Sequence, residues 1–266
     1  MSSTLVQEAW AVEVGSREPW DDDSKLFQPL EETQVQSNER AQSLAVQCFL
    51  RLCGLKHVVE QRVNAEFISP TGAMPVLKCG SFILSELDSI VNFVASKSIT
   101  LSADLSLTEK ADLKAYISLV GIRVQVILCN AELYFSWVSP LGYDVTYYRY
   151  GSVYPWPLNR ILPWRKRRMV KRTLKEWAEK DDVEVFNEIV SCLKALSERL
   201  ADKPFFFGAQ PTELDCLVFG HLFVLLNPSL EAAPGLRQVA PLVSNYPNLV
   251  QFCKQIETKY FPDEKL

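Results

Sequence analysis

An apolar stretch in the C-terminal half constrains the fold more than any other feature of the sequence. In KPFFFGAQPTELDCLVFGHLFVLL (203–226), Thr212 can cap a helix, and Asp215 can return the hydrogen bond in an aspartate form of the capping box. The predicted helix is apolar on nearly every side from 214 to 226, so it must lie at the centre of a helical domain. His221 lies mid-helix with no evident acidic or nucleophilic companion, which favours a buried core histidine over a catalytic one.

The first third of the chain has a different pattern, in which short strands alternate with helices. LFQP (26–29) predicts a strand, Ser37 or Asn38 can cap the helix that follows, and that helix is expected to end at Gly54. A second strand, an irregular segment, a hairpin and a helix come next, with the hairpin inside MPVLKCGSFILSE (74–86). A parallel pair joined by a crossover helix and extended by an antiparallel hairpin predicts a thioredoxin-like domain.

After residue 106 every periodic segment is helical. Ser106 and Glu109 can form a capping box, and the helical pattern after them continues to about Trp137. Further helices are predicted over 170–179, 183–200, 212–226 and 248–260. The predicted fold class is therefore α+β, with a thioredoxin-like domain followed by an all-helical domain. The expected divisions are an N-terminal extension that can be flexible (1–24), the thioredoxin-like domain (25–97), a linker (98–106) and the all-helical domain (107–266).

Charge and cysteine content argue against several classes of function. The formal net charge of -4 gives no global basic field, so nucleic acid is not an expected partner. The seven cysteines are scattered singly without a CxxC pair, and the two histidines are His57 and His221, so no metal site is expected. Dispersed cysteines are typical of small apolar core residues in a reducing compartment.

Targeting and membrane segments are not evident in the sequence. The first 24 residues carry one basic residue, Arg17, among several acidic ones, which is the wrong charge for a mitochondrial presequence. The longest uncharged apolar stretch near the C-terminus, 216–230, contains His221 and Pro228 and is shorter than the roughly 20 residues that a bilayer span needs. We therefore expect neither a cleavable address nor a membrane span.

A basic run is the strongest local charge feature of this acidic chain. Eight basic residues and no acidic one lie between positions 160 and 175. In a helix over 165–179, apolar residues would share one face and basic residues another. The basic face is either an ordinary solvated surface or a contact for anionic lipid headgroups or an acidic partner. Its residues are Arg165, Arg168, Arg172 and Lys175.

The segment before the basic run, YGSVYPWPLNR (150–160), is expected to form a rigid extended loop. Pro155 and Pro157 flank Trp156 and are incompatible with a regular helix there. Tyr154 and Trp156 either fill the core of the helical domain or present an aromatic anchor to a partner. Core packing is the favoured alternative, because large aromatic side chains contribute most when they are buried.

Two motifs give the chain after residue 24 a resemblance to the glutathione S-transferase superfamily. They are MPVLKCGSFILSE in the first domain and FFFGAQPTELDCLVFGHL (205–222) in the second. Within that superfamily the chain resembles the metaxin family, and is most similar to metaxins of the second type. The blocks that carry this resemblance are SLAVQCFLRLCGL (43–55), NAEFISPTGAMPVL (64–77), RYGSVYPWPLNRIL (149–162), QPTELDCLVFGHL (210–222) and YPNLVQFCKQIETKYF (246–261).

The resemblance implies a peripheral protein on the cytosolic face of the mitochondrial outer membrane. Metaxins act with the sorting and assembly machinery, which inserts β-barrel precursors into that membrane, and are also linked to apoptotic signalling and to mitochondrial transport by motors. The partners implied are a membrane-anchored metaxin of the first type, the barrel subunit of the machinery and motor adaptors. The chain ends at FPDEKL without the hydrophobic tail of the first type, as expected for the second.

The sequence meets the superfamily's requirements for glutathione binding only in part. Met74-Pro75 lies at the position of the cis-proline, and we expect this bond to be cis. Glu86 matches the acid of the acid-serine pair, but Leu87 replaces the serine and has no hydroxyl to donate to a ligand carboxylate. These four residues therefore indicate a vestigial site.

The residue that would contact the glutathione sulfur is also in doubt. No Tyr occurs near the first strand-helix connection, and Ser37 is a better candidate for a helix cap than for a catalytic residue. Glu31 and Glu32 would repel an anionic tripeptide if they faced the site. We therefore predict a non-enzymatic, partner-binding subunit with no cofactor, and keep a transport adaptor and a glutathione-dependent transferase as alternatives.

Overall fold

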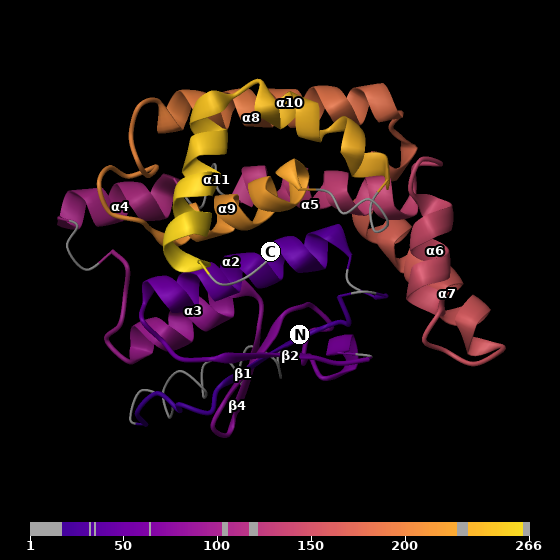
Figure 1. The fold of residues 1–266 in the computed structure, drawn as a ribbon, viewed down its shortest axis with the longest axis horizontal. Helices are drawn as coiled ribbons and strands as arrows, with labels where there is room; N and C mark the ends of the chain where they lie inside the picture. Colours follow the sequence, from indigo (N-terminus) through magenta and orange to yellow (C-terminus); the bar gives the residue numbers. More distant parts are fainter. Residues whose placement is uncertain are drawn as a thin grey trace.

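The computed structural model describes residues 18–31, 33–34, 36–63, 65–102, 106–116, 122–227 and 234–262. Figure 1 shows a small sheet at one side of the molecule, with α2 (Ser37–Leu52) and α3 (Leu87–Ser96) beside it and further helices stacked beyond them. An α+β part is thus followed by an all-helical part, and the predicted fold class is confirmed.

The sheet has four strands in the order β2-β1-β3-β4. β1 and β2 are parallel and are joined through α2, while β3 pairs antiparallel with both β1 and β4. Gly80 forms the turn between β3 and β4 with a φ of 57°, a conformation that glycine adopts without steric cost. The strands are β1 (Lys25–Gln28), β2 (Val58–Gln61), β3 (Val76–Cys79) and β4 (Phe82–Ser85).

The two faces of the sheet contact different cores. Leu26 and Leu77 are register partners, and both belong to the main hydrophobic core with α2 and α3. Phe27 and Val76, the next register pair, belong to a smaller cluster that includes Met74. Because side chains alternate along a strand, neighbouring pairs point to opposite faces, and the main core lies on the face toward the helices.

The helical part accounts for the rest of the described chain. Its helices are α4 (Leu107–Tyr116), α5 (Ile122–Trp137), α6 (Tyr143–Gly151), α7 (Leu158–Leu174), α8 (Asp182–Leu200), α9 (Glu213–Leu226), α10 (Ala240–Ser244) and α11 (Pro247–Tyr260). Short 3-10 turns are η1 (Ala65–Phe67), η3 (Lys175–Glu179) and η4 (Pro234–Gln238). None of the helices in the described part of the chain is long and apolar enough to cross a membrane.

Helix α9 lies at the centre, as its sequence predicts, and packs closely against α2. A Cβ atom on Gly220 would lie 2.2 Å from the Ala41 carbonyl oxygen and 2.9 Å from the Ala45 nitrogen. Both are backbone atoms of α2, so neither can move aside as a flexible side chain could. The absence of a side chain at Gly220 therefore allows the two parts of the molecule to pack this closely.

The predicted capping box holds the start of α9. The Thr212 nitrogen and hydroxyl each donate to Asp215 Oδ2 at 2.7 Å, and the Phe206 nitrogen donates to Asp215 Oδ1 at 2.9 Å. Burial raises the pKa of Asp215 to about 6 against the effect of these hydrogen bonds. Thr212 and Asp215 thus tie the loop before α9 to its first turn.

Two expectations about helix limits need correction. Gln36 caps α2, without a side-chain bond, so neither Ser37 nor Asn38 is the cap. The Ser106–Glu109 capping box is present, with the Glu109 nitrogen donating to Ser106 Oγ at 3.2 Å, but the expected long helix corresponds to α4 and α5. Residues 117–121, between those helices, lie outside the described residues.

The region around the tryptophan and its two prolines also differs from the prediction. A helix, α6, precedes it, and α7 begins at Leu158 directly after Pro157, although the sequence predicted a helix over 170–179. Residues 175–179 form the 3-10 turn η3 instead of the end of that helix. Pro163 lies inside α7 and is buried. A Cβ on Gly151 would lie 2.5 Å from the Asn159 oxygen, so close packing of α6 on α7 is what holds this unpredicted turn.

Candidate functional site

The resemblance stated above implies a glutathione site at the Met74-Pro75 turn, the start of α3 and the β1–α2 connection. The Met74-Pro75 bond is cis, as expected, and both residues are buried. The Met74 side chain packs in the smaller core cluster with Phe27. The turn is therefore part of the packed architecture of the sheet.

The start of α3 offers little to an anionic ligand. Glu86 is exposed and accepts a hydrogen bond from the Thr71 hydroxyl at 3.2 Å. Ser85 is buried, with its hydroxyl 3.0 Å from the same Thr71 oxygen. Leu87, at the serine position of the resemblance, is half-buried against the main core. The hydroxyls near this turn are thus engaged within the protein, and Leu87 supplies none.

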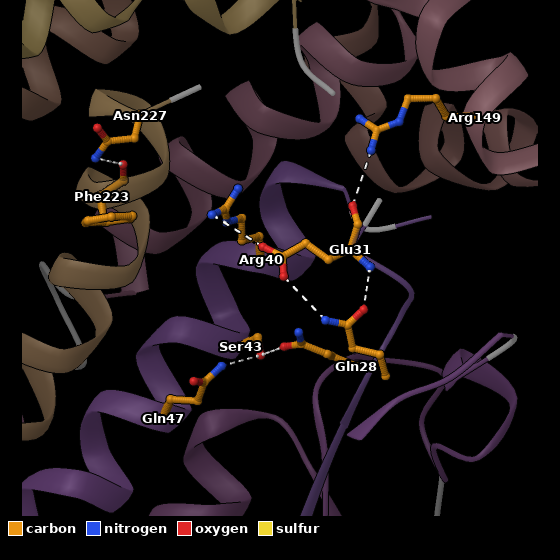
Figure 2. Close-up of polar contacts among 9 residues, drawn as sticks. Gln28, Glu31, Arg40, Ser43, Gln47, Arg149, Phe223 and Asn227 are labelled. Atoms are coloured by element: carbon orange, nitrogen blue, oxygen red, sulfur yellow. Dashed lines mark hydrogen bonds and ion pairs between the residues drawn. The ribbon is translucent and has the colours of Figure 1, made fainter. Parts of the chain in front are cut away.

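The β1–α2 connection is bound to its surroundings by the protein's own groups. The Glu31 carboxylate lies 3.4 Å from Arg40, and the Glu31 backbone carbonyl oxygen accepts from Arg149 of α6 at 3.3 Å (Figure 2). The Glu31 nitrogen donates to the Gln61 side chain at 3.0 Å. Glu31 therefore joins β2, α2 and α6. Glu32, which we expected beside it, lies outside the described residues.

A polar cluster lies between the two parts of the molecule, and we refer to it as the interdomain cluster. Lys166 of α7 contacts the carboxylates of Glu66 in η1 and Glu39 in α2, the latter at 3.6 Å. The Tyr150 hydroxyl donates to Glu66, and the Gln34 amide donates to the Tyr154 hydroxyl at 3.3 Å. The members of the cluster are Gln34, Glu39, Glu66, Tyr150, Tyr154 and Lys166.

Burial and charge both act on the ionisable groups of the interdomain cluster. Burial alone would lower the pKa of Lys166, but the Glu39 and Glu66 carboxylates outweigh it and raise that pKa. Burial raises the pKa of Glu39 against the effect of Lys166, and burial with the nearby Glu66 charge raises the pKa of Tyr150. The cluster thus keeps Lys166 charged.

The interdomain cluster borders a small pocket. It is lined by Pro29, Gln34, Glu39, Ala65, Glu66, Tyr150 and Tyr154. Its empty volume is about 230 Å³, part of which is open solvent, whereas sites for drug-sized ligands usually enclose about 300–1,000 Å³. The Gln34 amide donates to Tyr154 and the Tyr150 hydroxyl donates to Glu66, so the pocket fits a structural contact between the two parts of the chain better than a substrate site.

The outward side of α7 is a separate feature, which we define as the α7 surface. Trp156, Ile161 and Trp164 are 79%, 48% and 57% exposed, and Arg168 lies over the Trp164 ring at 5.6 Å. The basic residues predicted to share a face are all exposed, whereas Val170 and Leu174 on the other side of the helix are buried. The α7 surface consists of Trp156, Ile161, Trp164, Arg165, Arg168, Arg172 and Lys175.

Tyr154 and Trp156, the two aromatic residues before α7, differ in their surroundings. Tyr154 is half-buried and packs against the main core, which agrees with core packing. Trp156 is exposed, so core packing was wrong for this residue. Residues 152–157 form turns between α6 and α7, and the expected extended loop is absent from this stretch. In Figure 1, α6 and α7 lie at the end of the molecule opposite α4.

Sequence reasoning missed the interdomain cluster and treated the basic run as one unit. Lys166 lies about 100° around α7 from Arg165 and about 200° from Arg168, so the 3.6-residue period could have separated Lys166 from the exposed arginines. Glu39 and Glu66 gave no comparable signal, because their approach to Lys166 depends on how the two parts of the chain pack. His221 is a buried core histidine, but the expectation that it has no acidic or nucleophilic companion was wrong, since Glu132 and Cys129 lie beside it.

Comparisons with solved structures concern the fold alone. Glutathione transferase F7 from Populus trichocarpa matches with a TM-score of 0.54 at 13% identity, over 89% of this chain and 94% of that one. A glutathione transferase family member from Pseudomonas fluorescens pf-5, with two glutathione bound, matches with a TM-score of 0.53 at 13% identity, over 94% of each chain. The fold is therefore that of the glutathione transferases.

Two family descriptions and several curated relatives match the sequence. Residues 43–167 match "Outer mitochondrial membrane transport complex protein", and residues 189–256 match "Glutathione S-transferase, C-terminal domain". Metaxin-2 of Homo sapiens is 42% identical over 264 residues, which is 98% of this chain and 97% of the relative. The Metaxin-2 homolog of Caenorhabditis elegans is 39% identical, over 82% of this chain and 94% of the relative. Metaxin-1 of Mus musculus is 31% identical, over 83% of this chain and 70% of the relative.

The fold defines a glutathione-transferase-like protein. In it the Met74-Pro75 turn is packed in the core, and the β1–α2 connection is held by Arg40 and Arg149. The match to Metaxin-2 covers 98% of the chain and therefore extends over both of its parts. The chain belongs to the metaxin family.

Proposed function

We propose that this chain is a non-catalytic peripheral subunit at the cytosolic face of the mitochondrial outer membrane. There it would act with a membrane-anchored metaxin of the first type, and with the barrel subunit of the sorting and assembly machinery, in the import and assembly of outer-membrane β-barrel proteins. The matched description of an outer mitochondrial membrane transport complex protein and the Metaxin-2 relatives support this proposal. Metaxin-1 is a relative of this chain and the first candidate for the anchored partner.

The absence of catalysis is proposed from the state of the inherited site. Leu87 lacks the hydroxyl that an anionic ligand would need, and the Thr71 hydroxyl beside it is engaged with Ser85 and Glu86. Glu31 fixes the β1–α2 connection through Arg40 and Arg149. A substrate would have to displace these contacts before it could bind.

The α7 surface is the observation that carries the membrane role. Its exposed aromatic and aliphatic side chains precede a row of arginines along one side of the helix. Aromatic rings suit the interface between headgroups and acyl chains, while each basic residue near an anionic surface contributes about 1 kcal/mol. We therefore assign this surface to the anionic lipids of the outer membrane, and Trp156 and Trp164 to the interface.

Flotation with lipid vesicles tests this assignment. The full chain is expected to float with vesicles that contain phosphatidylinositol and to stay behind with neutral phosphatidylcholine vesicles. Replacing Arg165, Arg168 and Arg172 with Glu should abolish flotation, and Trp156→Ala should weaken it about tenfold, as loss of a central aromatic anchor does. A control with the same change of charge replaces Lys194, Lys203 and Lys254, which are exposed on other elements.

Pull-down on an anchored metaxin of the first type separates lipid from protein contact. The proposal expects the arginine variant to retain this partner while losing the vesicles. Loss of the partner with vesicle binding intact would reassign the α7 surface to protein contact. A wholly cytosolic pool after fractionation of cells would contradict the membrane role itself.

A further inference from the structure

A buried histidine links a cysteine to a carboxylate where α2, α5 and α9 meet. His221 of α9 has its Nδ1 atom 3.0 Å from Glu132 Oε1 and its Nε2 atom 3.7 Å from Cys129 Sγ. Cys129 and Glu132 lie three residues apart on α5, so both project from the same side of that helix. The Gln42 side-chain amide of α2 donates to the same sulfur at 3.6 Å.

The position of the two ring nitrogens distinguishes a relay from a metal site. Cys129, Glu132 and His221 are residue types that bind metal ions, and their ligand atoms lie within 4.8 Å of one another. A metal ion, however, would bind one nitrogen of the ring, and here the carboxylate lies at Nδ1 while the sulfur lies at Nε2. A carboxylate at one nitrogen and a nucleophile at the other is the arrangement that activates a thiol.

The surroundings of His221 favour its charged form. Glu132 and His221 are both completely buried, and Glu132 Oε2 has no hydrogen-bond partner among the described residues. Burial alone would lower the pKa of His221, but the Glu132 carboxylate and Cys129 raise it well above its usual range. The two groups that raise this pKa, Cys129 and Glu132, both lie on α5.

With the imidazole protonated, two donors converge on one sulfur atom. The Nδ1–H group donates to Glu132, the Nε2–H group points to Cys129 Sγ, and the Gln42 amide adds a second donor. A thiolate next to an imidazolium is the reactive form of cysteine. Cys129 is also half-buried, so a small reagent can reach its sulfur. Glu132 and His221 are completely buried and are not accessible to such a reagent.

We propose that Cys129 is a site of oxidative modification by peroxides, activated by His221 and Glu132. The Cys129 thiolate attacks one oxygen of hydrogen peroxide, an S–O bond forms and the O–O bond breaks. The sulfur loses two electrons and becomes a sulfenic acid, and the departing hydroxide takes the Nε2 proton of His221 to leave as water. The products are sulfenic acid, water and a neutral imidazole, so atoms and charge balance.

Cys53 serves as an internal control for this proposal. It is half-buried like Cys129, but burial and the nearby Glu213 charge raise its pKa to about 12. It therefore holds almost no thiolate at neutral pH. The remaining five cysteines, which are Cys48, Cys79, Cys192, Cys216 and Cys253, are buried.

The first test uses the wild-type chain and depends on no substitution. Limited alkylation with iodoacetamide, followed by peptide mass spectrometry, gives the rates at Cys129 and Cys53 at about pH 7. Cys129 is expected to react at least about tenfold faster than Cys53. A rate at Cys129 no higher than the rate at Cys53 would overturn the proposal.

The second test addresses the oxidation and the relay. After brief exposure to hydrogen peroxide, dimedone should label Cys129 and leave Cys53 unlabelled; absence of the Cys129 adduct would contradict the proposal. Glu132→Gln keeps the shape of the side chain but removes its charge, and should slow Cys129 alkylation at pH 7 about tenfold. Circular dichroism confirms that this variant is folded, and an unchanged rate in the folded variant would remove Glu132 from the mechanism.

Discussion

The two sides of helix α7 use the same kind of residue for opposite purposes. Lys166 points inward, is about one-tenth exposed, and binds Glu39 and Glu66 from the thioredoxin-like part. Arg165 and Arg168, its neighbours on the outward side, form no ion pair with any described residue. The contrast teaches that this basic run combines a structural joint with an exposed charged surface, and that only the surface is available to a membrane or partner.

Removing the inward charge is the strongest way to test this contrast. Lys166→Met should lower the free energy of unfolding by about 3–5 kcal/mol, because it leaves the buried Glu39 and the partly buried Glu66 carboxylates without their cation. Urea denaturation followed by tryptophan fluorescence measures the change. Adding Glu39→Gln and Glu66→Gln to Lys166→Met should restore part of the lost stability. If Lys166→Met lowers the free energy of unfolding by less than about 1 kcal/mol, Lys166 contributes no more to stability than an exposed arginine does.

Removing the outward charges should have the reverse consequences. Replacing Arg165, Arg168 and Arg172 with Gln should weaken binding to anionic vesicles by about 3 kcal/mol, or about 100-fold, at roughly 1 kcal/mol for each residue. The free energy of unfolding should change by less than about 0.5 kcal/mol per site, since the side chains are exposed. Vesicle titration and urea denaturation of one preparation give both numbers. If the free energy of unfolding fell by as much as the free energy of vesicle binding, the arginines would contribute to the stability of the fold.

Alkaline pH offers a smaller effect that is specific to the inward side. The pKa of Lys166 is raised in the folded protein, so its contribution to stability is complete below about pH 10.5 and is lost as the pH rises through the folded value. Tyr150, whose pKa is also raised, acts in the same direction above about pH 10. Above about pH 10, the urea midpoint of the wild type should therefore fall more steeply with pH than that of Lys166→Met. The same dependence of the midpoint on pH in both proteins would contradict the stabilising role of the Lys166 charge.

Local sequence pattern was sufficient for much of the fold. The helix predicted over 183–200 is α8 (Asp182–Leu200), and the one over 248–260 is α11 (Pro247–Tyr260). Both have a clear apolar face, and a buried face is what stabilises a helix in a folded protein. The helix α9, which is apolar on nearly every side, and the hairpin of β3 and β4 were evident from their own local patterns.

The features that were missed depend on contacts between distant residues. Local rules place Pro157 and Pro163 outside a helix, yet α7 contains Pro163 because α6 packs against it at Gly151. Glu132 and His221 are 89 residues apart in the sequence, and Glu66 and Lys166 are 100 apart. The spacing of Cys129 and Glu132 on one predicted helix was the single local signal of the relay.

The smallest expected effect is that of glutathione, and it tests whether the inherited site still binds. At 5 mM reduced glutathione the melting temperature should stay within about 0.5 °C, whereas a ligand with a dissociation constant near 1 mM would stabilise the native state by about 1 kcal/mol and raise it by about 2–4 °C. Leu87→Ser restores the missing hydroxyl and serves as the matched variant. It should also show no shift, because Thr71 and Glu31 remain bound within the protein. A shift in Leu87→Ser alone would mean that this leucine by itself abolished binding, and a shift in the wild type would favour a glutathione-dependent activity.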